Sequence, residues 1–420
     1  MTNTNSLSRR LGLVDAIAIG LGSMIGAGVF AAFAPAAAAA GSGLLIGLAI
    51  AAIVAYMNAT ASAQLAAQYP TSGGTYIYGR EQLGEWPGYF AGWSFVIGKT
   101  ASCAAMGLTF AAYVAPPGWE KLVAIGAVLI LAGVNYFGVT RTAAAAKVIV
   151  VVVISVLGLV VVAAAASGEG DSANLLGGLG ENGWYGVLQS AGLLFFAFAG
   201  YARIATMGEE VRSPQRTIPR AIVISLGLTL VVYVAIAVAA LATLGPERLA
   251  ESSAPLAEVA RIGGWEWTGP IVRIGAAAAA LGALLALIAG VGRTGLAMAR
   301  NDDLPRWLAA VHPRYKVPHR AELTLAVIVS VLILVTDLQG AIGFSSFGVL
   351  LYYLIANIAA YRQDAQHRRF PRPLQIVGAI GCVVLVATLP WQSIAGGIVV
   401  LLIGVTYRAI RLRVADRRHT

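Results

Sequence analysis

The sequence has little charge. Only 11% of its 420 residues are charged, whereas 58% are hydrophobic, and the mean hydropathy is +0.78. A soluble domain carries about 25% charged residues, and a water-soluble chain of this length would expose more polar surface than these residues supply. The composition therefore excludes a soluble enzyme, a nucleic-acid-binding protein and a disordered chain, and it predicts a membrane protein.

Cysteine and histidine are also scarce. Cys103 and Cys382 lie in apolar stretches without a CxxC pattern or a neighbouring histidine, so neither a disulfide framework nor a zinc site is expected. Both are interpreted as small buried hydrophobic residues. We expect no metal and no cofactor, because the four histidines all fall in polar loops or the tail: His312, His319, His367 and His419.

The abundant feature is the long apolar run. Runs such as VIVVVVISVLGLVVVAAAA are continuous, whereas strands of a membrane barrel alternate over about ten residues, so helices are predicted. The expected fold is an all-α polytopic membrane protein with twelve transmembrane helices, each bounded by proline, glycine or charge clusters. The predicted spans are about 13–36, 42–65, 89–115, 121–138, 145–166, 185–208, 218–243, 268–296, 321–336, 340–361, 372–389 and 391–408.

Basic residues are shared unevenly between the loops. With the N-terminus in the cytoplasm, cytoplasmic loops and tails hold about 22 of the 29 Lys and Arg residues and the outer loops hold about three. The net charge of +10 is thus a topology signal, and it predicts a multi-pass protein of the plasma membrane with both termini cytoplasmic. The N-terminal segment is 1–12. The basic tail 409–420 is expected to contact anionic lipid headgroups rather than nucleic acid.

Two of the predicted spans carry an interruption. The first contains GSMIGAG (22–28) and the sixth contains FFAFAGYAR (195–203). Taken alone, the glycines of the first motif could simply form a packing face, as GxxxG does between membrane helices. Paired interruptions at matching places in two halves of a chain, however, indicate a transporter binding site.

The spacing of the spans supports such a pairing. The two interruptions are about 174 residues apart, and the second and seventh spans start about 176 apart. Five spans separate the two units, so the second repeat must be inverted. We predict a first five-helix repeat over 13–166, a second, inverted one over 185–361, and two further helices within 372–408.

The interruptions have a chemistry of their own. An unwound turn in the membrane leaves backbone groups without partners, and each costs several kcal/mol unless a ligand, water or protein group satisfies it. Amides near 26–28 suit a carboxylate, and carbonyls near 195–199 suit an ammonium group. A zwitterionic amino acid satisfies both sets. Phe198 and Tyr201 either close over this substrate or serve helix packing.

Three motifs resemble those of one family of permeases. They are GLVDAIAIGLGSMIGAGVF (12–30), FFAFAGYARIATMGEEVRSPQRTIPRAI (195–222) and GRTGLAMARNDDLPRWLAAVHPRYKVP (292–318). With them the chain resembles the amino acid–polyamine–organocation superfamily over nearly its whole length. The resemblance implies a five-plus-five inverted-repeat fold of the leucine-transporter type with two extra helices, and amino acid uptake or exchange by alternating access.

The resemblance also implies a substrate site at the two interruptions. In the family the GSMIGAG segment binds the substrate carboxylate, which here corresponds to Ser23, Met24, Ile25, Gly26, Ala27 and Gly28. The FAFxG segment binds the amino group, which here corresponds to Phe195, Phe198, Ala199 and Gly200.

The chain departs from the family at two places. Many relatives carry an acidic residue at the position of Ala202, where it takes part in proton coupling or in reading basic side chains. Some proton-coupled relatives carry a lysine near 153–155, which this sequence lacks. The first departure disfavours a cationic substrate, and the second leaves the coupling ion open.

Four basic residues are assigned to the membrane interior, to which no carboxylate is assigned: Lys99, Arg203, Arg273 and Arg293. A charge at the bilayer centre costs a few kcal/mol, so each needs an explanation. Lys99 is interpreted either as a titrating amine that carries a proton or replaces a sodium ion, or as a structural lysine bound to carbonyls of a broken helix.

The arginines have structural alternatives as well. Arg203 contacts a substrate carboxylate or pairs with Glu210, and Arg273 reaches outward to the membrane surface. Arg293 pairs with Asp15 or Glu209 as an inner gate, or it too reaches the surface. The mixed segment 66–88 is expected to form an interfacial helix on the cytoplasmic side, with anchoring favoured over gating.

The sequence thus predicts a secondary transporter and not an enzyme. The expected substrate is an amino acid with an uncharged side chain, and the transport is coupled to protons or runs as exchange. The alternatives are a channel or a substrate-sensing receptor on the same scaffold, or a transporter of amines or polyamines. A membrane enzyme and an ATP-driven pump are disfavoured, because no triad, metal-ligand spacing or GxxxxGK[ST] motif occurs. Membrane lipids are expected partners, and the oligomeric state stays open.

Overall fold

The protein is built from α-helices. The computed structural model describes residues 11–26, 28–71, 73–138, 143–168, 170–176, 182–208, 210–262 and 265–416. Within these ranges the regular elements are all helical, and extended pairing is limited to one isolated bridge between Leu11 and Val211. The predicted all-α architecture is therefore confirmed for the part of the chain that the structure describes.

Both predicted interruptions are present. The first span is divided into α1 (Leu13–Met24), α2 (Gly28–Ala31) and α3 (Phe33–Ala40), followed by η1 (Gly41–Gly43). The sixth span is divided into α10 (Gly183–Phe198), η2 (Ala199–Tyr201) and α11 (Ala202–Ala205). The regular α-helix thus stops at the glycine-containing motif in each case.

The other ten predicted spans each correspond to one long helix. These are α4 (Leu44–Gln68), α6 (Glu85–Val114), α7 (Glu120–Tyr136), α8 (Ala143–Ala166), α12 (Pro214–Glu251), α14 (Thr268–Arg300), α15 (His319–Val335), α16 (Leu338–Arg362), α17 (Arg372–Thr388) and α18 (Trp391–Asp416).

Two helices, α12 and α18, extend furthest beyond their predicted ends, each by eight residues. α12 continues through a kink at Gly245, which has a φ of 71° and precedes Pro246. Proline removes a backbone donor and glycine tolerates positive φ, so the kink falls close to the predicted end of the span. α18 runs past the predicted 408 to Asp416, because its basic last turns remain helical.

Short elements lie between the long helices. α5 (Thr75–Leu83) forms within the segment predicted as an interfacial helix, and it is bounded by Gly74 and Gly84, whose φ values of 56° and 103° turn the chain at its two ends. α9 (Ala173–Leu176), α13 (Pro255–Ile262) and η3 (Arg306–Ala309) were not predicted, since one or two turns give too little periodicity to recognise.

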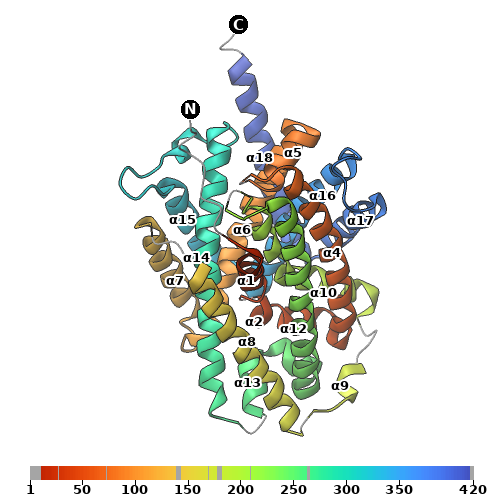
Figure 1. Cartoon of the computed structure of the whole chain (residues 1–420). Helices are drawn as coiled ribbons and strands as arrows, with labels where there is room; N and C mark the ends of the chain where they lie inside the picture. Colours follow the sequence, from red (N-terminus) through yellow and green to blue (C-terminus); the bar gives the residue numbers. More distant parts are fainter. Residues whose placement is uncertain are drawn as a thin grey trace.

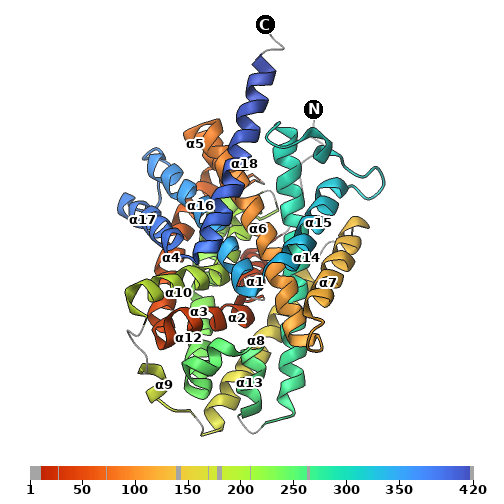
Figure 2. The same cartoon turned by 180° about the vertical axis from the view of Figure 1, so that it is seen from behind.

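The short helices mark two opposite ends of the molecule. α5 and the C-terminal turns of α18 lie at the top in Figure 1, and α9 and α13 lie at the bottom. The view from behind in Figure 2 shows the same division. We call these the α5 end and the α13 end.

The helices pack in two groups, which we call the two packing neighbourhoods: one is arranged around α6, and the other contains α1, α4, α11 and α12. α6 packs against α14 and α16, and it also contacts α7 and α15. α11 packs against α1, α4 and α12 instead. The two interrupted spans therefore lie close together, and α6 and α14 face them from the other neighbourhood.

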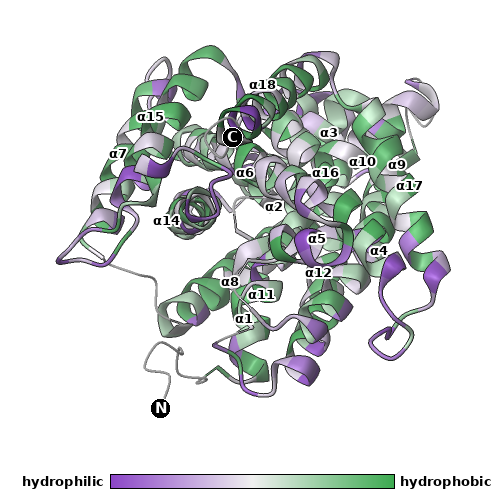
Figure 3. Cartoon of the chain, turned by 90° about the horizontal axis from the view of Figure 1, so that it is seen from above, coloured by the Kyte–Doolittle hydropathy of each residue, from purple (hydrophilic) through white to green (hydrophobic). Residues whose placement is uncertain are grey.

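The outer surface is apolar. Large hydrophobic side chains of α8, α15 and α18 are exposed, and in Figure 3 hydrophobic residues cover the peripheral helices while hydrophilic ones gather in loops. Nine segments in the described ranges are long and apolar enough to cross a membrane, and α17 is apolar but shorter. This supports a polytopic membrane protein, while the count of twelve spans stays a prediction.

Candidate functional site

The backbones of the two interrupted spans touch each other. A Cβ atom added to Gly200 would lie 2.6 Å from the backbone nitrogen of Met24, and one added to Gly28 would lie 2.8 Å from Cα of Ala197. Real Cβ atoms do not approach so closely, so only glycine permits this contact. The glycines that interrupt the helices thus also bring the two breaks together.

A tyrosine hydroxyl connects the two breaks. The hydroxyl of Tyr233, on α12, lies 2.5 Å from the carbonyl oxygen of Met24 and 3.0 Å from that of Ala197. Its ring contacts Phe33 and Phe198, and only 1% of the residue is exposed. Tyr233 therefore satisfies carbonyl groups that the end of each helix leaves free.

Lys99 reaches the second break from α6. Its amine donates a hydrogen bond of 3.3 Å to the carbonyl oxygen of Ala199, and the residue is only 8% exposed. The hydroxyl of Tyr353 lies 3.4 Å from the same oxygen. A protein ammonium group thus already occupies one of the carbonyls predicted to receive the amino group of a substrate.

The other predicted binding residues surround the same place. Ser23 and Gly200 are half-buried, and the hydroxyl of Ser23 donates to the carbonyl oxygen of Ile19 at 2.8 Å. Ala27 lies outside the described residues. The members that are buried are Met24, Ile25, Gly26, Gly28, Phe195, Phe198, Ala199 and Tyr201.

Aromatic rings and α14 form the walls of this region. Tyr353 packs edge-on against Phe195 and stacks on Tyr201, with ring centroids 5.8 and 5.0 Å apart. On the other side, a Cβ atom at Gly26 would meet Cβ of Ala283 at 3.1 Å. Apart from Lys99 and Arg203, the described side chains named at the breaks are neutral.

The predicted pairing of Arg293 with Asp15 is wrong. Asp15 instead forms an ion pair with Lys147 of α8, at 2.5 Å, and accepts the backbone N–H of Gly12. α8 packs directly on α1, which brings the lysine to this carboxylate first. Glu209, the alternative partner, lies outside the described residues.

The other two arginines differ in their contacts. Arg203 lies within electrostatic range of Glu210, but no ion pair within 4.0 Å joins these two described residues. Arg273 turns toward the C-terminal end of α6 and donates a hydrogen bond of 2.9 Å to the carbonyl oxygen of Tyr113. A helix C-terminus favours a cation, which accounts for this position.

A buried carboxylate lies near the start of the span predicted at 321–336. Glu322, in the first turn of α15, is only 3% exposed and packs against α14 at Gly292. Its position within one turn of the predicted span start made it look like a surface residue. The neighbouring glycine, which admits the side chain, is the signal that could have revealed it.

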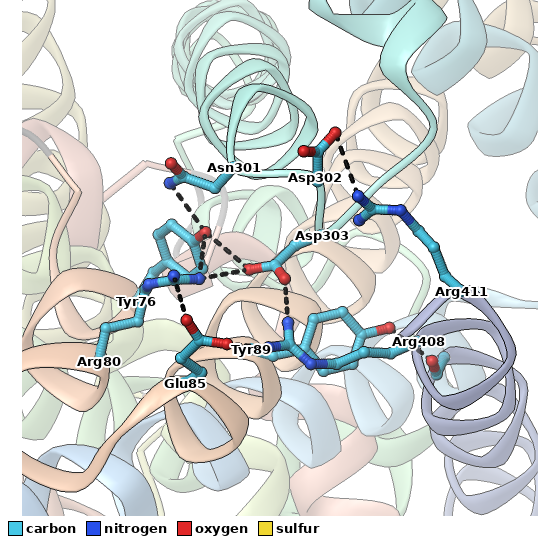
Figure 4. A network of polar contacts seen from close by, with 10 residues as sticks. Tyr76, Arg80, Glu85, Tyr89, Asn301, Asp302, Asp303, Arg408 and Arg411 are labelled. Atoms are coloured by element: carbon cyan, nitrogen blue, oxygen red, sulfur yellow. Dashed lines mark hydrogen bonds and ion pairs between the residues drawn. The ribbon is translucent and has the colours of Figure 1, made fainter. Parts of the chain in front are cut away.

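A polar network joins four elements at the α5 end (Figure 4). Asp303, which follows α14, pairs with Arg408 of α18, and it accepts hydrogen bonds from Arg80 at 3.0 Å and from the hydroxyl of Tyr76 at 2.8 Å. Glu85, at the start of α6, contacts both arginines. The network therefore fixes α5 and α18 to the ends of α6 and α14.

The network is buried at its centre. Asp303 is 4% exposed and Arg408 is 4% exposed. Burial and the bond to Asp303 raise the pKa of Tyr76 to about 12, so this phenol stays a neutral donor. At the rim, the Arg306 guanidinium holds the pKa of Asp302 below its usual value. Through these contacts the segment 66–88 anchors α5 to the neighbouring helices, which is a structural role.

In the described part of the chain we looked for other candidate sites, namely a cluster of metal ligands and a pocket. Among the described residues, no group of three or more His, Cys, Asp or Glu side chains could hold a metal ion. A surface hollow of about 680 Å³ at the α13 end is lined by residues such as Glu258, Arg261 and Arg273. It opens at the surface between α13 and the start of α14, whereas the breaks combine burial with unusual backbone geometry.

Comparison with known proteins identifies the family. A family model described as amino acid permease matches residues 11–406. An uncharacterised transporter of Mycobacterium tuberculosis is 60% identical over 99% of this chain and 93% of its own length. The chain is 30% identical to cationic amino acid transporter 7, chloroplastic, of Arabidopsis thaliana, over 85% of this chain and 66% of that protein. It is 25% identical to the branched-chain amino acid permease BcaP of Bacillus subtilis, over 95% and 92%.

The family match extends through both interrupted spans, the α5 segment and α18 as far as residue 406. It agrees with the resemblance carried by the three sequence motifs, and it accounts for the many apolar helices. This chain therefore belongs to the amino acid permease family, within the amino acid–polyamine–organocation superfamily, and is a multi-pass membrane transport protein.

Proposed function

We propose that the protein moves amino acids across the plasma membrane by alternating access, with the substrate held between the two breaks. The observation that carries this proposal is the direct contact of the two interrupted helices around buried, mostly neutral side chains. Backbone amides after the first break and carbonyls before the second are complementary to the two charges of a zwitterion.

The proposed topology has twelve spans in two inverted five-helix repeats, 13–166 and 185–361, followed by two helices. The α5 end is assigned to the cytoplasm. It carries the network arginines and the last turns of α18, whereas the α13 end carries few basic residues. The positive-inside rule then places both termini in the cytoplasm.

The proposed substrate has an uncharged side chain. Phe195, Phe198 and Tyr201 offer apolar surface, and Ala202 stands where many relatives carry an acid. Among the relatives, the name of one refers to branched-chain and that of another to cationic amino acids. A basic side chain next to the Lys99 amine would meet a like charge, so we favour a branched-chain or similar neutral substrate.

Proton coupling or exchange would act through the same place. Lys99 is bonded to Ala199, so protonation of the amine and binding of a substrate ammonium group compete for one carbonyl. This competition is the simplest physical route from a titrating side chain to substrate affinity. We therefore propose Lys99 as the coupling residue, and Arg203 and Arg293 as gating residues on the inner side.

Counterflow in proteoliposomes tests the proposal. Vesicles loaded with unlabelled leucine should accumulate labelled leucine transiently, whereas vesicles loaded with arginine or putrescine should not. A channel would equilibrate the label without trans-stimulation, and a receptor would show binding without flux. If putrescine drives counterflow and leucine does not, the protein is an amine transporter and the substrate assignment is wrong.

A further inference from the structure

The buried carboxylate of Glu322 lacks a full set of partners. One of its oxygens, Oε2, is buried and has no hydrogen-bond partner among the described residues, although buried carboxylates are normally satisfied. The side chain is held in place by packing, since a Cβ atom on Gly292 would lie 2.7 Å from Cγ of Glu322. A buried carboxylate of this kind either takes up a proton or keeps its charge beside a compensating cation.

The cation nearby is Arg293. It follows Gly292 on α14 and lies within electrostatic range of Glu322. Unlike the glutamate, its side chain is exposed, and no ion pair within 4.0 Å holds it among the described residues. The guanidinium is therefore free to change its position while the carboxylate stays fixed in the α14–α15 interface.

Arg293 also faces a like charge. Arg203, on α11, lies within electrostatic range of Arg293. The two arginines belong to the two packing neighbourhoods, since α11 packs on α1 and α12, whereas α14 packs on α6 and α15. Two cations on opposing elements repel each other as the elements approach, unless an anion lies beside them.

We propose that Glu322 is a gating residue whose negative charge lets Arg203 and Arg293 come together when the α5 end of the transporter closes. Glu322 acts through Arg293 and is a positioning residue, because it lies in the α14–α15 interface and none of its contacts reaches the breaks. Among the described residues, Glu210 on the Arg203 side and His319, one turn before Glu322 on α15, are further titratable groups near this cluster. This inference rests on the proposed alternating access, but its test needs no substrate.

The test measures access to the first break from the cytoplasmic side. Cys103 and Cys382 are buried and are replaced by alanine, and Ser23→Cys is introduced as the reporter. The rate of labelling by a membrane-impermeant maleimide is then measured in inside-out vesicles. Four variants are compared with this background: Glu322→Gln, Glu322→Asp, Arg293→Gln and the double variant Arg293→Gln/Glu322→Gln.

Loss of the negative charge should hold the α5 end open. We expect Glu322→Gln to raise the labelling rate about fivefold or more, Glu322→Asp to restore it, and Arg293→Gln to lower it. The effect of Glu322→Gln should disappear in the Arg293→Gln background, because Arg203 and Arg293 then no longer repel each other. Glu81→Gln, which removes an exposed carboxylate of α5 at the same end, is the matched control and should change nothing.

Two results would overturn the proposal. One is a labelling rate for Glu322→Gln equal to that of Glu81→Gln. The other is an equal rise with and without Arg293, which would mean that the substitution loosens packing rather than removing a charge. If Glu322→Gln does not fold, Arg293→Gln still tests the proposal, because a labelling rate equal to or above that of the background would contradict it. Failure of leucine counterflow alone would contradict the substrate assignment and leave this gate intact.

Discussion

The amine of Lys99 and the carbonyl oxygen of Ala199 are 3.3 Å apart, in a part of the protein where both residues are buried. Lys99 lies on an uninterrupted helix, and Ala199 begins the short turn that separates α10 from α11. The lysine therefore satisfies a backbone group that the interruption has exposed. This bond and the nearby hydroxyl of Tyr353 stabilise the break, and the proposed substrate ammonium group would compete with both.

Lys99→Met should reduce transport strongly. Methionine fills similar space but donates no hydrogen bond, so the Ala199 carbonyl keeps only the contact with the Tyr353 hydroxyl, at a cost of about 0.5–1.5 kcal/mol. We expect leucine counterflow to fall at least tenfold and to lose its pH dependence. Lys99→Arg, which keeps a donor and a charge, is the control and should retain part of the activity. An unchanged rate and pH profile for Lys99→Met would remove Lys99 from the coupling role.

Tyr233→Phe should weaken the connection between the two breaks while preserving the ring contacts. The substitution removes the hydroxyl that lies 2.5 Å from Met24 O and 3.0 Å from Ala197 O. We expect a loss of about 1–3 kcal/mol in stability and a lower midpoint of thermal denaturation in detergent. The exposed Tyr185 at the start of α10 offers a matched control, and Tyr185→Phe should leave the midpoint unchanged. Equal midpoints for both variants would contradict the role assigned to Tyr233.

Gly200→Ala should separate the two breaks. Its methyl group would overlap the backbone of Ser23 and Met24, which cannot move aside as a flexible side chain would. We expect leucine transport to be abolished even where the protein is inserted normally. Gly227→Ala on α12 is the control, because a Cβ atom there meets nothing within 4 Å and alanine favours a helix by about 1 kcal/mol over glycine. Active Gly200→Ala protein would show that the breaks need not touch.

Local pattern was enough to predict the helices and the interruptions, because both depend on residues close together in sequence. The span predicted at 145–166 corresponds to the helix Ala143–Ala166, and the one at 121–138 to Glu120–Tyr136. Apolar runs set the helix lengths, and glycine motifs set the places where the helix is interrupted. The assignment of substrate-binding residues to those motifs remains a prediction.

Side-chain partners from distant segments could not be predicted in this way. Tyr233 looked like any tyrosine of an apolar span, yet it contacts a carbonyl 209 positions earlier in the chain. From the sequence, Asp15 could pair with any of several basic residues on the same side of the membrane. Its partner is Lys147 because α8 packs against α1. Glu322 was missed because burial near a helix end depends on the glycine of a neighbouring helix and not on its own sequence context.

Asp303→Asn should be the most destabilising change at the α5 end. The carboxylate is buried between Arg80, Arg408 and the hydroxyl of Tyr76, and these contacts join segments that are 105 or more positions apart. Asparagine keeps the shape but removes the buried partner of the Arg408 guanidinium and leaves it only the exposed Glu85, 3.4 Å away. Removal of one partner of a buried ion pair typically costs about 3–5 kcal/mol. The measurement is the midpoint of thermal denaturation in detergent, which should fall by several degrees.

The adjacent Asp302 provides the matched control for Asp303. It forms ion pairs with Arg306 and Arg411, but it lies at the rim of the network, where solvent screens the charges. Asp302→Asn should therefore lower the midpoint far less, although the two substitutions are chemically identical and one position apart. Arg408→Lys should fall between them, because lysine keeps the charge but cannot contact Asp303 and Glu85 with the same fork of donors. If both aspartate variants melt together, the buried pair does not fix α18, and the network is only a surface feature.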